Sequence, residues 1–132
     1  MRFAYDAIDL IRDCILLGSH DWEVGGLLFG DDEFVWTILP GRNIAPNPCS
    51  EFALHPQEMA RALRNAEVRG EHLVGTFHSH PNGNSQMSSA DAAMALQTGV
   101  LLIIGLASPW EWRLWDPAAG GEVELVIEPP RA

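Results

Sequence analysis

The chain has 132 residues and a formal net charge of −10, from 18 acidic residues against eight basic ones. All eight basic residues are arginine, too few cations to replace the counterions of nucleic acid. The longest apolar stretch, residues 100–107, is far shorter than the ~20 residues of a membrane helix. Charged residues also interrupt any N-terminal signal core. We therefore expect one cytoplasmic domain over residues 1–132 that binds neither nucleic acid nor membrane.

The first third of the chain predicts a helix followed by a hairpin. Apolar residues recur at spacings of three and four over residues 4–18, which is typical of an amphipathic helix, and Gly18 ends it. Two apolar runs, residues 24–29 and 34–39, are joined by a short acidic loop and predict a β-hairpin. Residues 40–48 contain three prolines and predict an irregular connection.

The middle of the chain predicts alternating strands and helices. Residues 51–54 are predicted as a short strand, and Pro56 opens a helix that runs to Gly70. A strand over residues 73–77 delivers His78 at its end. A polar loop then leads to a third helix over residues 89–98.

The last third predicts strands over residues 100–106, 110–115 and 122–127. Helices and strands in this mixed order favour an α/β fold of the α+β type, with a central, largely antiparallel sheet flanked by helices. Trp110 and Trp112 share a strand face with Leu114, which favours core packing. The alternative is that these tryptophans, with Trp115, form a partner-binding patch.

His78 and His80 are the first candidates for a metal site. Alternate residues of a strand point to the same face, so these two imidazoles stand about 6.5 Å apart along the chain. Pro81 turns the chain, and Asp91 falls in the first turn of the next predicted helix. Two histidines and one carboxylate form a donor set of the catalytic zinc type, which leaves a coordination position for water.

Two further residues have candidate catalytic roles. Hydrolysis needs a group that takes a proton from water and a donor for the charge that develops on the attacked carbonyl. Glu23 is the candidate base and Ser88 the candidate donor.

Each of these residues also has a structural explanation. Residues 88–91 match a helix capping box, in which Ser88 and Asp91 satisfy backbone amides. His78 and His80 are equally compatible with surface imidazoles at a strand end, and Glu23 with an ordinary solvated glutamate. The other histidines lack a partner at ligand spacing and are interpreted as surface or capping residues: His20, His55 and His72.

The joint pattern is more specific than its parts. Glu23 on an early strand, followed by His78, His80, Pro81, Ser88 and Asp91 in the order H-x-H-P-x6-S-x2-D, resembles the signature of the JAMM (MPN+, Mov34/PAD-1) metalloprotease family. The segments 23–30 and 74–77 are also similar to strands of that family. The resemblance implies a curved, mostly antiparallel mixed sheet flanked by helices, which is the cytidine-deaminase-like JAMM/MPN fold.

The resemblance also implies roles for these residues. His78, His80 and Asp91 would bind one Zn²⁺ per chain. Glu23 would act as general base and return the proton to the leaving amine, and Ser88 would support the oxyanion. The implied reaction is hydrolysis of the amide or isopeptide bond after the C-terminal glycine of a ubiquitin-like protein. The chain looks more like the short prokaryotic members, some of which act beside sulfur-carrier proteins of the ubiquitin fold.

Two other functions compete with this one. The same fold occurs as a non-catalytic MPN-type interaction module, but such relatives usually lack part of the ligand set, whereas this chain has all of it. A DNA-repair-associated branch has a similar HxHP motif, and the net charge of −10 argues against it.

Overall fold

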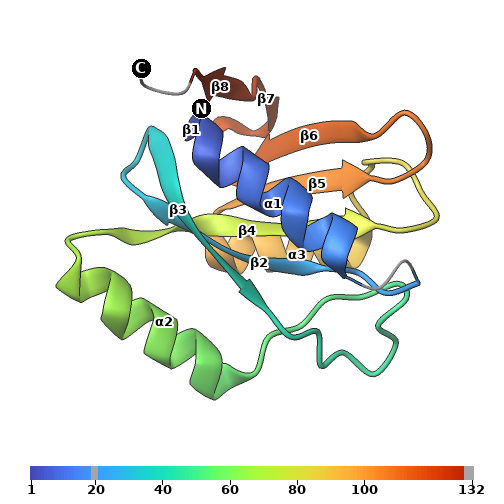
Figure 1. Ribbon diagram of the computed structural model, residues 1–132, viewed down its shortest axis with the longest axis horizontal. Coiled ribbons are helices and arrows are strands. Elements are labelled where there is room, and N and C mark those ends of the chain that lie inside the picture. The colour runs from blue at the N-terminus through green and yellow to red at the C-terminus, as the bar shows by residue number, and fades with distance from the viewer. Residues whose placement is uncertain (19–20, 130–132) are drawn as a thin grey trace.

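The computed structural model describes residues 1–18 and 21–129, and a single mixed sheet organises them (Figure 1). The helices in this part of the chain are α1 (Tyr5–Leu17), α2 (Pro56–Val68), α3 (Ser89–Thr98) and a short 3-10 turn, η1 (Pro117–Ala119). The strands are β1 (Arg2–Ala4), β2 (Gly25–Gly30), β3 (Phe34–Gly41), β4 (His72–His80), β5 (Val100–Gly105), β6 (Glu111–Asp116), β7 (Gly121–Val123) and β8 (Val126–Glu128).

The sheet has the strand order β7-β6-β5-β4-β2-β3-β1-β8. Strand pairs β2/β3, β2/β4, β5/β6 and β6/β7 are antiparallel, whereas β4/β5, β1/β3 and β1/β8 are parallel. Strands β7 and β8 follow each other in the chain but stand at opposite ends of this order. The sheet is therefore curled, and the backbone of Met1 fastens the connection by bonding with Glu124 and Val126.

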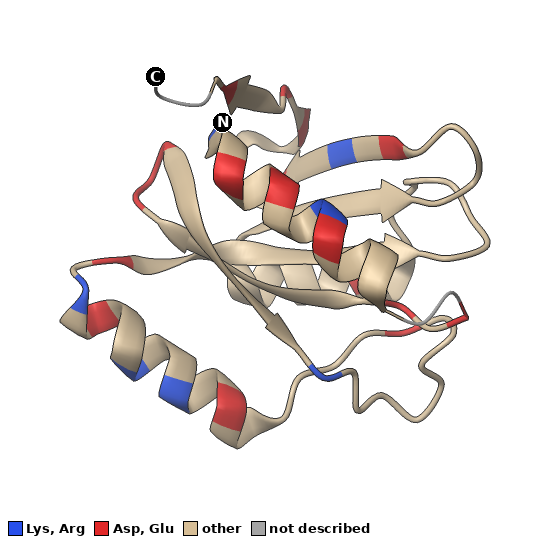
Figure 2. Ribbon diagram, in the orientation of Figure 1, with Lys and Arg blue, Asp and Glu red and all other residues tan. Residues whose placement is uncertain are grey.

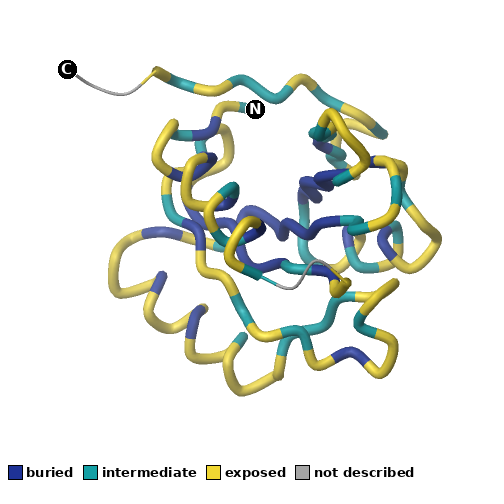
Figure 3. Tube along the Cα trace, turned by 45° about the vertical axis from the view of Figure 1, so that its right-hand side comes forward, coloured by how far each residue is buried: buried dark blue, intermediate teal, exposed yellow. Residues whose placement is uncertain are grey.

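Helix α1 packs on one face of the curled sheet, and α2 and α3 pack on the other (Figure 1). The buried residues of α1, Ile8, Ile11 and Ile15, contact the main core, which includes Leu28 and Leu102. In each strand, the residues next to these core residues point to the other face of the sheet. Thus Leu27 packs with α2, and Leu101 and Ile103 with α3. Buried positions follow the strands, whereas the outer faces of the helices are exposed (Figure 3).

Charged side chains lie mainly on the helices and loops, and the central strands carry few of them (Figure 2). No described helix is long and apolar enough to cross a membrane. The tryptophans of the C-terminal third pack inward: Trp110 and Trp112 lie against the main core, and Trp115 lies against the cluster beneath α3. The prediction of core packing for these residues is confirmed.

The three predicted helices and the predicted hairpin are confirmed within one or two residues. The predicted strand at residues 51–54 is wrong. The side chain of Asn43 accepts from the Ala53 amide and donates to the Glu51 carbonyl, so a side chain takes these backbone groups in place of a neighbouring strand. His55 caps α2 by accepting from the Gln57 amide, as the capping interpretation predicts.

The strand predicted over residues 73–77 is longer, because β4 continues to His80 and contains both histidines. Two other differences lie near the chain ends. Strand β1 has only three residues, too few to show a periodicity, and was not predicted from the sequence. The predicted strand at residues 122–127 is two strands, β7 and β8, because the chain crosses there from one edge of the sheet to the other. The expectation for His20 lies outside the described residues.

A matched pair of leucines tests the position of the core. Leu102 has no exposed surface, whereas Leu17, at the end of α1, is 88 % exposed. Leu102→Ala should lower the free energy of unfolding by about 2–5 kcal/mol because it leaves a cavity in the main core. Leu17→Ala should change it by less than about 0.5 kcal/mol. Urea denaturation measures both, and equal effects would contradict the assigned core.

Candidate metal centre

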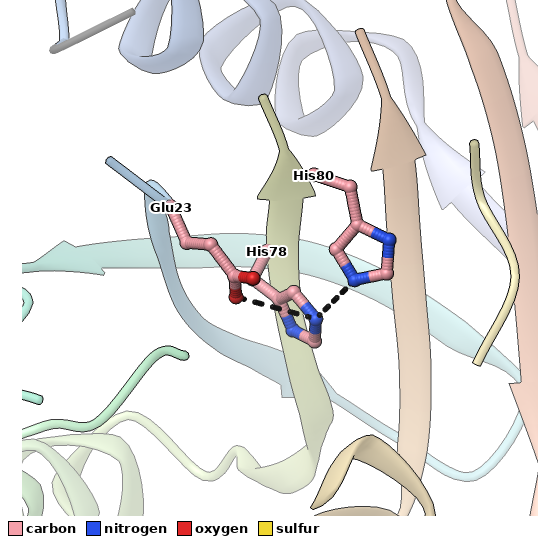
Figure 4. Close-up of side chains that lie close together, drawn as sticks. All are labelled: Glu23, His78 and His80. Atoms are coloured by element: carbon pink, nitrogen blue, oxygen red, sulfur yellow. Dashed lines mark hydrogen bonds and ion pairs between the residues drawn. The ribbon is translucent and has the colours of Figure 1, made fainter. Parts of the chain in front are cut away.

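The end of β4 brings two imidazoles together (Figure 4). His78 is completely buried and His80 partly buried, and their Nε2 atoms are 3.2 Å apart. The residue between them, Ser79, points the other way. Its amide donates to the Val24 carbonyl, and its Oγ accepts from the Val24 amide. Ser79 therefore fixes the end of β4 to the segment that leads into β2.

Asp91 approaches both imidazoles from the first turn of α3. Its Oδ1 is 3.0 Å from His78 Nε2, and its Oδ2 is 3.2 Å from His80 Nε2. Asp91 also forms a capping box with Ser88: Oδ2 accepts from the Ser88 amide, and Ser88 Oγ accepts from the Asp91 amide. The capping interpretation of these residues is thus confirmed. It coexists with the contacts to the imidazoles, because the cap orients the carboxylate toward them.

Glu23 enters from the segment before β2 and is 96 % buried, so it is not an ordinary solvated glutamate. Its Oε1 lies 3.7 Å from His78 Nε2 and has no hydrogen-bond partner among the described residues. Ligand atoms of Glu23, His78 and His80 all lie within 4.8 Å of one another. The strand register explains this approach, because Gly25 pairs with His78 and places Glu23 just beyond the end of the ladder.

Asn43 holds the backbone of Glu23 in place. Its Nδ2 lies 3.0 Å from the Glu23 carbonyl, 3.3 Å from that of Pro48 and 2.8 Å from that of Glu51. The Glu23 amide itself donates to the Pro48 carbonyl at 2.8 Å. One side-chain amide therefore joins Glu23 to the loop of residues 43–53.

The rings of both histidines have further contacts that orient them. His80 Nδ1 is 2.8 Å from the Asn84 carbonyl, which can only accept, so this nitrogen carries the proton and Nε2 presents a lone pair. The His78 ring stacks against Phe52 at 6.4 Å between centroids. Gly25 permits this arrangement. A Cβ there would lie 2.5 Å from the Phe77 carbonyl oxygen and 2.9 Å from the Phe52 ring.

The environment shifts the pKa values of the two carboxylates in opposite directions. Burial raises the pKa of Glu23 to about 7; the charge of His80 opposes this shift, and the nearby Asp91 and Glu51 add to it. Burial also raises the pKa of Asp91, but hydrogen bonds with His78 and His80 outweigh this effect. The pKa of Asp91 therefore lies well below the usual range. For His80, burial lowers the pKa, and the bonds to Asp91 and Asn84 outweigh it, so the net shift is upward.

A shallow cleft of about 230 Å³ gives access to these groups. Glu23, His80 and Ser88 line it, together with residues of the two neighbouring loops: Cys49, Ser50, Pro81, Asn82, Gly83 and Asn84. Ser88 uses its hydroxyl oxygen as acceptor in the cap, so its one hydroxyl proton is available for donation in the cleft.

The donor set fits a small divalent cation. Two imidazole nitrogens and a carboxylate suit a tetrahedral transition-metal site, in which neighbouring ligand atoms stand about 3.3 Å apart. The Nε2 atoms of His78 and His80 are 3.2 Å apart, and each lies within 3.2 Å of one Asp91 oxygen, Oδ1 for His78 and Oδ2 for His80, which is close to that spacing. Buried charges in proteins are usually paired or coordinate metals. The unpartnered, buried oxygen of Glu23 beside this set is consistent with the second case.

The structure thus brings together all five residues that the sequence singled out, from the segment before β2, from β4 and from the start of α3. Sequence reasoning did not identify the residues that support them: Asn43, Ser79, Asn84 and Phe52. No spacing pattern marks such residues, because each acts through contacts between segments far apart in the chain. Only the position of Ser79 between two histidines was a local signal.

Comparison with known proteins places this arrangement in a family. Residues 15–117 match the model of the prokaryotic homologs of the JAB domain. The chain belongs to this family, and the resemblance to JAMM/MPN+ proteins drawn from the sequence is confirmed. The fold and the relatives together define a hydrolytic metalloenzyme of the JAMM type.

Individual relatives are similar over most of the chain. The desampylase of Haloferax volcanii is 32 % identical over 72 % of this chain and 73 % of its own length. The desampylase of Pyrococcus furiosus is 32 % identical over 86 % of this chain and 81 % of its own. A probable TtuB-protein conjugate cleaving protease of Thermus thermophilus is 30 % identical, covering 85 % of this chain and 73 % of that protein.

Among solved structures, protein DSY2949 of Desulfitobacterium hafniense has the same fold, with a TM-score of 0.81 and 24 % identity over 98 % of this chain and 94 % of its own. A structure described as a metalloprotease-like zinc site in the proteasome and signalosome has a TM-score of 0.57 and 17 % identity, covering 98 % of both chains. The predicted curved mixed sheet is confirmed by the topology and by these neighbours.

The role of Asn43 can be tested with an isosteric change. Asn43→Asp replaces an amide donor by an oxygen that faces three carbonyls, and should destabilise the protein by about 1–3 kcal/mol. Hydrogen exchange of the 43–53 loop should accelerate as well. Asn65→Asp, at an exposed position of α2, is the control and should leave both unchanged. Unaltered loop protection in Asn43→Asp would contradict the anchoring role.

The raised pKa of Glu23 predicts a pH dependence of the metal-free protein. The folded chain keeps the Glu23 proton up to about pH 7, and the unfolded chain releases it near pH 4.5, so this residue lowers stability as the pH rises through that window. Between pH 5 and pH 8, Glu23→Gln should gain about 2 kcal/mol of unfolding free energy relative to the parent protein. Urea titrations with a chelator present measure the difference. A gain that is the same at both pH values would rule out this cause.

Proposed function

We propose that this protein is a zinc-dependent metallopeptidase. It hydrolyses the amide or isopeptide bond after the C-terminal glycine of a ubiquitin-like or sulfur-carrier protein. The observation that carries the proposal is the convergence of two imidazoles and two carboxylates at one end of the sheet, beside an open cleft. Relatives at 30 to 32 % identity are named for cleaving such conjugates, which supports the choice of substrate.

The distances support different roles for the two carboxylates. Asp91 reaches both Nε2 atoms, one with each oxygen, so it completes a ligand set with His78 and His80. Glu23 stands farther off: its Oε1 is 3.7 Å from His78 Nε2, and its ligand atom lies within 4.8 Å of those of both histidines. The carboxylate of Glu23 is therefore assigned as the proton carrier rather than as a ligand. A zinc ion held by His78, His80 and Asp91 would supply a Lewis acid and a nucleophile derived from water at neutral pH.

The other residues act on the proton and the charge of the reaction. Glu23 accepts the proton of the attacking water at its unpartnered Oε1 and delivers it to the leaving amine. Ser88 donates its hydroxyl proton to the oxygen on which negative charge develops. The capping box keeps the Ser88 oxygen fixed while that proton remains available. Asn43 and Ser79 both hold the peptide group between Glu23 and Val24, Asn43 at its carbonyl and Ser79 at its amide.

The shape of the cleft supports a slender substrate. Small residues line part of it, among them Ser50, Gly83 and Ser88. A C-terminal tail that ends in glycine fits such a surface in an extended conformation. The relatives named desampylase and TtuB-protein conjugate cleaving protease favour a carrier of the ubiquitin-like class as the protein that presents this tail.

Metal analysis tests the ligand assignment without a substrate. Purified protein should contain one zinc per chain, and His78→Ala should contain none after dialysis, because a buried donor at the centre of the cluster is gone. The control is His72→Ala, which removes an exposed imidazole whose Nε2 lies 3.1 Å from Asp32 Oδ1. Stoichiometric zinc in His78→Ala would refute the ligand set. A parent protein that takes up no zinc would favour the non-catalytic interaction module.

Turnover tests the role of Glu23. Glu23→Gln should retain zinc and lose activity on a ubiquitin-like carrier conjugated through its C-terminal glycine, by about 10²–10⁴-fold, the usual contribution of a general base. Glu67→Gln, on the exposed side of α2, removes the same kind of group and should cleave at the parent rate. A Glu23→Gln protein that cleaves at the parent rate would exclude Glu23 from proton transfer.

A further inference from the structure

One peptide group near the metal centre connects a predicted ligand to a distant carboxylate. The carbonyl of Asn84 accepts from His80 Nδ1 at 2.8 Å, and the amide of the next residue, Ser85, donates to Oε1 of Glu111 at 3.3 Å. These two atoms belong to the same planar peptide unit, in which C=O and N–H point in opposite directions. His80 and Glu111 therefore bind the two ends of a single dipole.

The sheet places these partners in one row. His80 at the end of β4 pairs with Gly105 at the end of β5, and Gly105 pairs with Glu111 at the start of β6. Strands β4, β5 and β6 lie side by side, and these three residues lie at the same end of the sheet (Figure 1). His80 and Glu111 thus flank Gly105, and the peptide between Asn84 and Ser85 crosses from one to the other.

Gly105 provides the space for this crossing. A Cβ at that position would lie 2.6 Å from the carbonyl carbon of Asn84 and 2.7 Å from the amide nitrogen of Ser85. Both contacts are with backbone atoms, which cannot move aside like a flexible side chain. The side chain of any other residue at 105 would push the peptide between Asn84 and Ser85 away from its position between His80 and Glu111.

Glu111 is held as an anion by the donors around its Oε1. The Ser85 hydroxyl and amide both donate to this oxygen, and Arg113 Nε approaches it at 3.3 Å. The hydrogen bonds from Ser85 and the charge of Arg113 keep the pKa of Glu111 below its ordinary value. Ser85 is fully buried, whereas the Glu111 side chain that accepts its two bonds is 47 % exposed.

We propose that Glu111 is a positioning residue for the metal centre, which acts on His80 through the peptide between Asn84 and Ser85. An anion at the N–H end polarises the peptide and strengthens its carbonyl as an acceptor. The stronger bond holds His80 in the tautomer with the proton on Nδ1 and makes Nε2 a better donor to the metal. The inference rests on the proposed function in one respect, namely that His80 is a ligand.

The competing explanation is that Glu111 only anchors the loop of residues 81–88. An anchor contributes to stability but has no effect on which ring nitrogen of His80 carries the proton. The tautomer of His80 therefore separates the two explanations, and it can be read in the metal-free protein from the imidazole ¹⁵N shifts of histidine-labelled samples.

The experiment compares three variants at Glu111 and Glu122. Glu111→Ala removes the acceptor, and Glu111→Gln keeps an oxygen but removes the charge. Glu122→Ala is the matched control, because Glu122 pairs with the same Arg113 at 3.3 Å and has no bond to Ser85. In Glu111→Ala the tautomer of His80 protonated on Nε2 should appear, and the zinc dissociation constant should rise about tenfold, the lower end of the range for outer-shell partners. Glu111→Gln should give smaller changes in the same direction, and Glu122→Ala should change neither quantity.

Gly105→Ala is an independent variant, because it displaces the peptide while leaving every charge in place. It should reproduce the change in His80 tautomer seen in Glu111→Ala. Unchanged His80 resonances in a folded Glu111→Ala protein would overturn the proposal, including where stability falls, since that result identifies a loop anchor. A parent protein that binds no zinc would overturn the proposed function instead, and the tautomer comparison in metal-free protein would still decide the role of Glu111.

Discussion

The pairing of β2 with β4 is the constraint on which the site depends. It sets Gly25 opposite His78, so the residue two places before β2 reaches the end of β4. A slip of one residue would turn the side chains of one strand to the other face and would separate Glu23 from the imidazoles. Ser79 stabilises the observed register, because its amide and hydroxyl both form hydrogen bonds with the backbone of Val24.

The second constraint is the cost of burying charge. Two carboxylates and two imidazoles lie together with little solvent, an arrangement that is unfavourable unless each group has partners. The two carboxylates differ in how many partners offset this cost. Asp91 contacts both imidazoles and accepts a hydrogen bond from the Ser88 amide, whereas one oxygen of Glu23 has no partner within the described residues. Neighbouring carboxylates with such different surroundings are suited to different tasks, one as a fixed anion and one as a proton carrier.

Loops hold the site in place through individual side chains. The Asn43 amide ties the 43–53 loop to Glu23, and Glu111 ties the 81–88 loop to the start of β6. In each case a polar side chain satisfies backbone groups that an irregular segment would otherwise leave to water. The site is therefore built on the ends of two central strands and one helix, with the loops fastened against them.

Much of the fold and the site follows from local sequence. The helices at α1, α2 and α3 and the β2–β3 hairpin could be predicted, because periodicity, proline, glycine and capping residues act within a few positions of the chain. The candidate residues Glu23, His78, His80, Ser88 and Asp91 could be named because their motif is contiguous apart from the glutamate. The curl of the sheet, the division of residues 122–127 between its two edges, and the loop at residues 51–54 could not, since each depends on partners far away in the chain.

The sequence by itself determined which residue types were available for metal chemistry and which elements carried them. The tertiary structure alone decided that Glu23 is buried beside His78, that Asp91 both caps a helix and contacts two imidazoles, and that a peptide over Gly105 joins His80 to Glu111. The physical reason is that strand register and close backbone approach are set by packing across the whole sheet, and no spacing rule within one segment contains that information.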